Sequence, residues 1–342
     1  MKVDVAVRGP LRDAGREAHR LEQAGYDGVW AAETSHDPFP AVTLAATATT
    51  TVEVGTGIAV AFARNPMNLA TLGHDLQVLS EGRFILGLGS QVQAHIDRRF
   101  SMPWSKPADR MREMVQAIRA IWACWNEEAP LAFEGEFYRH TLMPPFFNPG
   151  PSPFGPPRVF LAGVGPRMIE VAGEVADGFL CHGFTTASYL LASVMPALER
   201  GLARGNRERA DIEVTAPGFI VTGRDDEEMA RSAAGVRRQL AFYGSTPAYR
   251  PVLEHHGWGD LQSDLHQMAR EGRWEQMGDR IDPDMVDAFA VVGPPTEIAR
   301  LVAERYGDTV DRINAYSPFD VDDGLWALVR QGFAELTQAG TR

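Results

Sequence analysis

Cysteine is scarce in this chain, as are the features of metal-binding and membrane-spanning proteins. Of 342 residues only Cys124 and Cys181 are cysteines, and their spacing matches no metal or redox motif. No apolar run approaches the roughly 18 residues of a membrane span. The amino terminus lacks the charged head and long apolar stretch of a signal peptide. No set of histidines and carboxylates has ligand-like spacing, so no metal site is predicted. These absences are consistent with a protein of the reducing cytoplasm.

Basic residues are also fewer than acidic residues. Lysine and arginine number 33 against 45 aspartates and glutamates, which gives a formal net charge of −12. An acidic surface argues against a nucleic-acid partner and against an anionic membrane. With 44% hydrophobic and 23% charged residues, the chain has the composition of a globular enzyme. We therefore expect a small-molecule substrate.

What the chain does have is a repeated alternation of short apolar segments and helical patterns. About eight strand–helix units predict an α/β fold, a TIM (β/α)8 barrel that spans residues 1–342 as a single domain. A doubly wound open sheet is the alternative. Two segments, at about 126–157 and 243–287, lack this strand–helix alternation and are predicted to be excursions from the barrel. The first is predicted to contain a small hairpin near 133–138. The predicted strands are 3–7, 28–32, 52–61, 84–88, 158–162, 178–181 and 212–221, with 288–292 and 312–315 as the remaining candidates.

Two of these strands end in spaced glycines. After strand 158–162 the chain reads Gly163-Val164-Gly165-Pro166-Arg167 and then begins a helix. Successive backbone N–H groups at a helix amino end form an anion-binding site, and Arg167 adds positive charge. A tight strand-to-helix turn is the simpler interpretation. From these residues alone, phosphate binding and a simple turn stay equally open.

The other glycine-rich strand end reads Gly87-Leu88-Gly89-Ser90-Gln91. The side chains of Ser90 and Gln91 have the polar groups needed to hydrogen-bond the edge of a planar ring. The alternative is a barrel corner where glycine is needed for packing.

Polar residues follow the second and sixth predicted strands. Glu33 and His36 lie just beyond strand 28–32, and an imidazole there has a pKa suited to proton transfer. His36 as a solvated loop histidine is the simpler interpretation. His182 follows strand 178–181, where a barrel places functional residues, and a capping role is equally open.

The order and spacing of several short motifs resemble the bacterial luciferase-like superfamily, and most closely its branch that uses the deazaflavin coenzyme F420. The resemblance covers nearly the whole chain. Its pieces are Ala24-Gly25-Tyr26-Asp27-Gly28-Val29-Trp30, Gly55-Thr56-Gly57-Ile58, Arg64-Asn65-Pro66, Leu79-Ser80-Glu81-Gly82-Arg83-Phe84-Ile85-Leu86-Gly87-Leu88-Gly89, Ala162-Gly163-Val164-Gly165-Pro166 and Ala176-Asp177-Gly178.

This resemblance implies a TIM barrel with insertions, usually a homodimer or a larger homo-oligomer. It also implies hydride transfer between a substrate carbon and F420, with FMN as the alternative cofactor. It assigns cofactor contacts to Gly57, Ile58, Ala59, Ser90, Gln91, Ala162 and the 163–167 loop, which would hold the phosphate. The family has an Asp-His pair where this chain reads His36-Asp37, and His36 is therefore the leading catalytic candidate for proton transfer. Glu33, at the same strand end, is the second catalytic candidate, and His182 is added to the cofactor contacts by its position on the barrel rim.

The resemblance also implies a non-proline cis peptide at Gly57-Ile58, forming a bulge behind the ring. One departure matters. The sugar-phosphate dehydrogenases of this family carry an acidic glutamate where this chain reads Ser90-Gln91-Val92-Gln93-Ala94-His95, so that reaction is not expected.

Four basic residues form a cluster that could hold the acidic tail of F420 or be a solvated face. They are Arg98, Arg99, Lys106 and Arg110. Arg64 and Arg83 are expected in buried ion pairs. The rival functions are an FMN-dependent monooxygenase, a metal-dependent barrel hydrolase and a cofactor-binding protein without turnover.

Overall fold

The computed structural model describes residues 1–127, 129–314, 316, 318 and 323–340. The chain divides into two compact units. The amino-terminal unit consists of Ala6–Leu180 and Ala197–Glu213, and the carboxy-terminal unit consists of Met1–Val5, Cys181–Pro196 and Val214–Arg342.

The amino-terminal unit contains a run of neighbouring parallel strands. They are β2 (Gly28–Ala31), β3 (Glu53–Thr56), β5 (Phe84–Gly89), β8 (Arg158–Gly163) and β9 (Gly178–Cys181). A short strand, β4 (Ala59–Val60), continues beyond β3 and pairs with β5. Every residue of β2 and β5 is buried. Parallel strands covered by helices are buried on both faces, which explains why these segments are continuously apolar.

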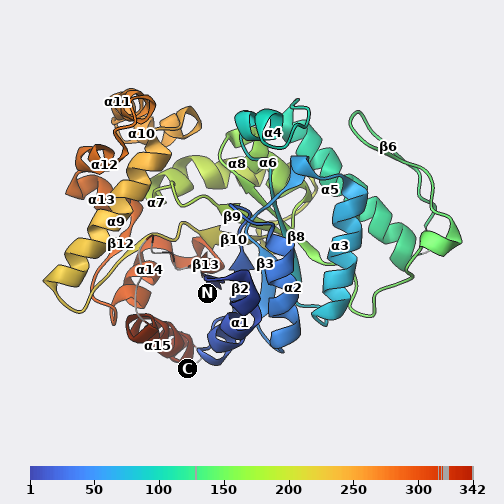
Figure 1. Cartoon of the computed structure of the whole chain (residues 1–342), viewed down its shortest axis with the longest axis horizontal. Coiled ribbons are helices and arrows are strands. Elements are labelled where there is room, and N and C mark those ends of the chain that lie inside the picture. Colours follow the sequence, from blue (N-terminus) through green and yellow to red (C-terminus); the bar gives the residue numbers. More distant parts are fainter. Residues whose placement is uncertain (128, 315, 317, 319–322, 341–342) are drawn as a thin grey trace. The chain divides into compact units, whose positions relative to one another are not determined.

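The helices of this unit follow the strands and pack on one another in chain order (Figure 1, blue to green). The larger ones are α1 (Ala14–Gln23), α2 (Pro38–Ala48), α3 (Pro66–Leu79), α5 (Pro107–Asn126) and α6 (Pro166–Val175), and α4 (Gln93–Arg98) is a short one. Four of them, α2, α3, α5 and α6, begin with proline. Proline has a fixed φ and lacks an N–H, so it suits the first turn, where the N–H has no partner within the helix.

The carboxy-terminal unit contains three neighbouring parallel strands. Strand β13 (Arg312–Asn314) lies between β1 (Lys2–Ala6) and β10 (Glu213–Ala216). These three and the five above supply the eight parallel strands of the predicted barrel. Ala315, the end of the last predicted strand, lies outside the described residues.

A buried ion pair joins two strands of this unit. Arg312 donates from Nε and Nη2 to the two carboxylate oxygens of Asp4, each at 2.8 Å, and both side chains are 0% exposed. The sequence analysis did not predict this pair.

Three strand predictions were partly wrong. The segment 52–61 forms two strands, β3 and β4, with the Gly57–Ile58 cis peptide bond between them. The segment 212–221 forms β10 and a separate strand, β11 (Ile220–Val221), because Pro217 between them has no N–H for a sheet hydrogen bond. In the segment 288–292, helix α13 (Pro283–Phe289) takes the first residues, and β12 (Val291–Val292) pairs with β11 in a small parallel sheet.

The two predicted excursions differ in structure. The first holds the predicted hairpin, formed by β6 (Phe133–Glu134) and β7 (Arg139–His140). The second is helical: α10 (Arg250–His255), α11 (Gly259–Arg270), α12 (Trp274–Met277) and α13 follow α9 (Asp226–Gly244) (Figure 1, yellow to orange). The unit also holds α14 (Ile298–Tyr306), which packs on α15 (Asp323–Gly340). In the part of the chain that is described, no helix is long and apolar enough to cross a membrane.

Candidate active site

The predicted site residues other than His182 follow the carboxyl ends of strands in the amino-terminal unit. In the parallel register Ala31 pairs with Thr56, and Leu88 pairs with both Ala59 and Leu161. Parallel strands in such register end at one edge of the sheet. That edge is where the residues after β2, β4, β5 and β8 gather, and in α/β folds it is the usual location of ligand sites.

The chain between β3 and β4 forms the predicted bulge, with a cis peptide bond between Gly57 and Ile58. Backbone hydrogen bonds fix it on both sides: the Gly57 N–H donates to the Ala31 carbonyl (2.8 Å), and the Glu33 N–H donates to the Ile58 carbonyl (3.1 Å). Gly57 is exposed and Ala59 is buried. Ile58 is partly exposed, so Gly57 and Ile58 are the parts of this segment that a ligand can touch, whereas Ala59 is not.

Glu33 is held by neighbouring groups. Its Oε2 accepts hydrogen bonds from the Val60 N–H and from Arg64 Nη1, both at 2.7 Å, and its side chain is only 6% exposed. Arg64 also pairs with Asp37, whose Oδ1 accepts from the Phe39 N–H and caps α2. This network ties the loop after β2 to β4. Glu33 is thus hydrogen-bonded and nearly buried, and its catalytic role stays a prediction.

His36 lies in the same loop and is exposed. The loop backbone is fixed by Asp37 and by Arg99, which donates to the Thr34 carbonyl at 2.6 Å. The His36 imidazole makes no hydrogen bond to any residue that the structure describes. It is thus an accessible proton carrier on an anchored loop, and its role in proton transfer stays a prediction.

The glycines at the end of β5 are explained by packing. A Cβ on Gly87 would lie 1.8 Å from the Thr56 carbonyl oxygen, and one on Gly89 would lie 2.9 Å from the Ile58 side chain. Beyond them Ser90 and Gln91 are partly exposed, and Gln91 has a φ of 58°. Close packing accounts for both glycines, so within this motif only Ser90 and Gln91 remain candidates for ligand contact.

The loop from Gly163 to Arg167, which we call the Gly165 loop, presents bare backbone. The Gly165 carbonyl accepts from the N–H groups of Met168 and Ile169, which starts α6. The amides of Val164, Gly165 and Arg167 donate to no acceptor among the described residues. Gly165 and Arg167 are exposed, and nothing lies within 4 Å of a Cβ built on Gly165. The geometry is that of an open anion-binding loop at a helix amino end.

The predicted basic cluster is only partly available. Arg110 is buried, donates to the Pro103 carbonyl and lies over the Phe62 ring. Lys106 pairs with Glu136 at 2.7 Å. Arg98 is exposed. The packing of Arg110 makes it a structural residue.

Arg64 forms the ion pairs expected of it, whereas Arg83 does not act through a carboxylate. Arg83 donates to the carbonyls of Ala46, Thr49 and Val52, where α2 ends. The expected ion pair is replaced by capping, because the last carbonyls of a helix lack partners within it.

His182 belongs to the carboxy-terminal unit and has a different environment. Its ring stacks on Tyr249 and meets Tyr243 edge-on, both at 4.7 Å between centroids. With Phe184 these residues form what we call the His182 cluster. Burial lowers the pKa of His182 to about 4. The sequence analysis did not find Tyr243 or Tyr249, since neither stands in a recognisable motif.

No group of three or more His, Cys, Asp or Glu side chains is placed to hold a metal in the described structure. The hydrolase alternative, which needs such a cluster, finds no site within these residues.

Comparison with known proteins identifies relatives of this chain. An uncharacterized protein of Mycobacterium tuberculosis is 53% identical over 92% of each chain. A 5,10-methylenetetrahydromethanopterin reductase of Archaeoglobus fulgidus is 25% identical over 88% of each chain.

Among solved structures, a coenzyme F420-dependent tetrahydromethanopterin reductase from Methanopyrus kandleri superposes with a TM-score of 0.77, at 20% identity over 96% of each chain. The predicted TIM-barrel fold is thereby confirmed. Proteins of the same fold also include an FMN-bound monooxygenase. Residues 2–312 match the family model for luciferase-like monooxygenases, and this chain therefore belongs to the luciferase-like family.

Proposed function

We propose that this protein is an F420-dependent oxidoreductase that transfers a hydride between F420 and a small organic substrate. The observation that carries the proposal is the Gly165 loop, which offers unpaired amides beside exposed Arg167 at the carboxyl end of a barrel strand. Such a loop suits the phosphate of a ring cofactor. The relatedness to the tetrahydromethanopterin reductases supports F420 as that cofactor.

The residues present fit a phosphate group. Gly165 has a φ of −82°, which any residue can adopt, so its backbone does not require glycine. The open space beside its α carbon does suit glycine, because a side chain there would stand next to the free amides. Arg167 is 72% exposed, and its contact with Asp109 is long at 3.4 Å. A surface pair of this kind is weak, so Arg167 can turn to a phosphate at little cost.

We assign further roles to the residues at the other strand ends. When bound, F420 supplies a planar ring that accepts or donates the hydride. Exposed backbone at Gly57 and the side chains of Ser90 and Gln91 are the groups we assign to positioning that ring. His36 is the group we assign to moving the substrate proton, and the Glu33–Arg64 pair holds its loop.

Cofactor titration tests the proposal. F420 and FMN are added separately to the full-length protein, and binding is followed by fluorescence. We expect F420 to bind at least about tenfold more tightly, followed by loss of oxidised deazaflavin absorbance with one member of a panel of reduced substrates. Tighter binding of FMN would favour the monooxygenase alternative. Binding without hydride exchange would favour the non-catalytic one, and binding of neither would overturn the proposal.

Two variants locate the phosphate. Gly165→Ala puts a methyl group beside the amides without a backbone or packing conflict, so we expect about tenfold weaker F420 binding at an unchanged melting temperature. Arg167→Ala is expected to weaken binding about threefold to tenfold. Arg16→Ala is its matched control, since Arg16 is 79% exposed and also pairs with one carboxylate, Asp13. Equal affinity in Gly165→Ala and the wild type would remove this loop from the site.

Homo-oligomer formation, which the family resemblance implies, stays a prediction. Gel filtration with light scattering measures it directly, and a monomer would contradict it.

A further inference from the structure

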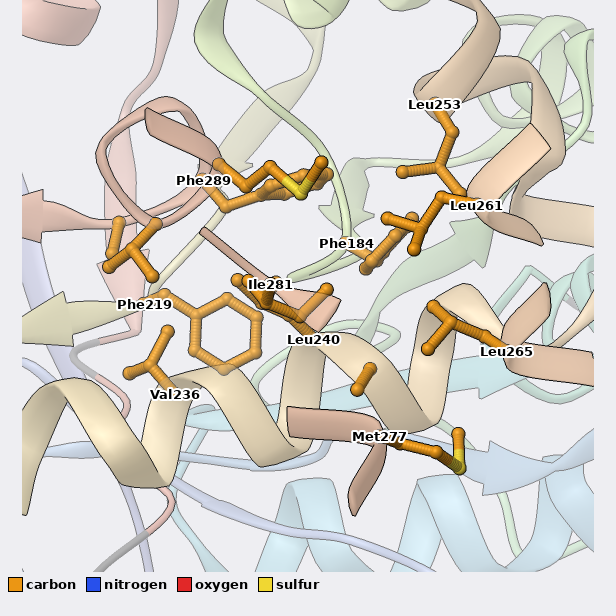
Figure 2. Packing of buried hydrophobic residues seen from close by; sticks show 14 of the residues in the cluster. Phe184, Phe219, Val236, Leu240, Leu253, Leu261, Leu265, Met277, Ile281 and Phe289 are labelled. Atoms are coloured by element: carbon orange, nitrogen blue, oxygen red, sulfur yellow. The ribbon is translucent and has the colours of Figure 1, made fainter. Parts of the chain in front are cut away.

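A second concentration of chemically capable groups lies in the carboxy-terminal unit. The His182 cluster sits beside a large apolar core that includes Phe184, Phe219 and Phe289 (Figure 2). Phe184 contacts both the apolar core and the cluster. Its ring centroid lies 4.5 Å from that of Phe289 in the core and 5.4 Å from that of Tyr249 in the cluster. Polar groups in such surroundings must be hydrogen-bonded, so the partners of His182 and Tyr249 can be assigned one by one.

The hydrogen bonds fix the tautomer of His182. Its Nδ1 accepts the backbone N–H of Phe184 at 3.0 Å. An amide N–H can only donate, so Nδ1 carries no proton and the neutral ring carries its proton on Nε2. Nε2 lies 3.0 Å from the Tyr249 hydroxyl. His182 therefore donates to the oxygen of Tyr249.

That assignment determines what Tyr249 can do. Its oxygen already accepts a hydrogen bond from His182, so its own O–H proton points to another acceptor. Tyr249 is a partly buried residue, and its O–H proton is left without an acceptor among the described residues. Tyr243 differs, because its hydroxyl is hydrogen-bonded to Gln239.

The cluster is uncharged at neutral pH. Burial holds the pKa of His182 at about 4, and burial together with the neighbouring Tyr243 raises the pKa of the Tyr249 phenol above its usual value. No carboxylate, lysine or arginine hydrogen-bonds to either ring within the described residues. A neutral donor among aromatic faces suits an uncharged ligand with one acceptor oxygen better than it suits an anion.

We infer that Tyr249, oriented by His182, is a hydrogen-bond donor to the carbonyl oxygen of a neutral, largely apolar ligand. A ligand of this class is a ketone or an aldehyde, whose carbonyl oxygen accepts a hydrogen bond and carries no charge. The Phe184 amide fixes His182, and His182 fixes the phenol, so the donor is held in place before the ligand binds. Such preorganisation lowers the entropy cost of binding.

The test uses acetophenone labelled with 13C at its carbonyl carbon as the probe. It is titrated into the full-length protein without added cofactor and followed by NMR. We expect saturable binding with a downfield shift of the carbonyl signal, which reports a donated hydrogen bond. Tyr249→Phe should lose that shift and bind about fivefold to tenfold more weakly, as expected for one neutral hydrogen bond. Tyr189→Phe removes a hydroxyl elsewhere in the same unit and should change neither measurement.

Two substitutions of His182 separate orientation from packing. His182→Gln reaches the position of Nε2 and retains a donor for Tyr249, whereas His182→Asn reaches only the position of Nδ1 and retains the acceptor for the Phe184 amide. We expect His182→Gln to keep most of the carbonyl shift and His182→Asn to lose it. Equal loss in both variants would show that His182 only packs the cluster, and would overturn its orienting role.

Cofactor titration of the same variants keeps the two proposals distinct. Probe affinity that is equal in the wild type and in Tyr249→Phe, or no binding of the probe at all, overturns the inference even when F420 binds. Probe binding that depends on Tyr249 in a protein that binds no F420 supports the carbonyl site and overturns the proposed function.

Discussion

The Gly165 loop and the His182 cluster present their hydrogen-bond donors in opposite ways. The loop leaves backbone amides exposed at a helix end, beside a flexible, exposed arginine. The cluster holds its donor, the partly buried Tyr249, beside aromatic rings and orients it through a fixed histidine. The first arrangement suits an anion, because a helix amino end carries partial positive charge. The second suits a neutral oxygen, because it adds no charge. Different neighbouring residues hold the two regions in place. Substitutions in each unit can therefore test these residues separately.

The largest effect is expected in the carboxy-terminal unit, at its buried ion pair. Asp4→Asn would remove the carboxylate charge that faces the buried Arg312 guanidinium, and we expect the free energy of unfolding to fall by about 3–5 kcal/mol. Urea denaturation measures the change. The double variant Asp4→Asn, Arg312→Met should recover part of the loss, because it also removes the buried guanidinium charge. A single variant within about 1 kcal/mol of the wild type would contradict the prediction.

A comparable loss is expected in the amino-terminal unit from one added methyl group. Gly87→Ala places a Cβ 1.8 Å from the Thr56 carbonyl oxygen, so β3 and β5 must separate. We expect a loss of about 3 kcal/mol, typical of overpacking. Gly165→Ala is the matched control, since its Cβ meets nothing within 4 Å. If both variants unfolded at the same urea concentration, overpacking at Gly87 would not be the cause of the loss.

The His182 cluster should make stability depend on pH. The pKa of His182 is about 4 in the folded protein, against 6.5 for an unperturbed histidine. The unfolded chain therefore binds the proton first as the pH falls. The free energy of unfolding should drop between pH 6.5 and pH 4, by at most about 3 kcal/mol, and this group should have no effect above pH 6.5.

Urea denaturation at several pH values measures this dependence. In His182→Gln the histidine contribution should disappear, while the acid sensitivity that comes from the carboxylates remains. Parallel stability profiles for the two proteins would show that His182 is not buried as a neutral ring.

The smallest effect is expected at the loop that holds His36. In Glu33→Gln the amide oxygen can still accept the Val60 N–H, but the charge facing Arg64 is lost. We expect about 1–2 kcal/mol of destabilisation and about threefold weaker F420 binding. Glu17→Gln breaks an exposed pair with Arg20 and should stay within about 0.5 kcal/mol. Equal effects would mean that the Glu33–Arg64 pair does not position the loop.

Local patterns explain which site residues could be predicted from the sequence. The 163–167 segment could be recognised as an anion-binding candidate because its glycines, its proline and the following helix are adjacent in the chain. The cis peptide at Gly57–Ile58 agrees with the expectation from the family resemblance. The two glycines at the end of β5, Gly87 and Gly89, resemble those of the Gly165 loop in sequence, yet they serve packing. A glycine motif does not reveal what lies opposite its missing side chain.

The sequence alone determined the alternation of buried parallel strands and helices. The signals for it are local, because the spacing of apolar residues and the positions of proline and glycine set each element within a few residues. Only the tertiary structure decided which polar groups meet. Asp4 and Arg312 are 308 positions apart, and His182 and Tyr249 are 67 apart. Their meeting depends on how distant strands and helices pack, which no local pattern encodes. For Arg312 and Tyr249 alike, the sequence specifies the side chain, and the tertiary structure determines which group it contacts.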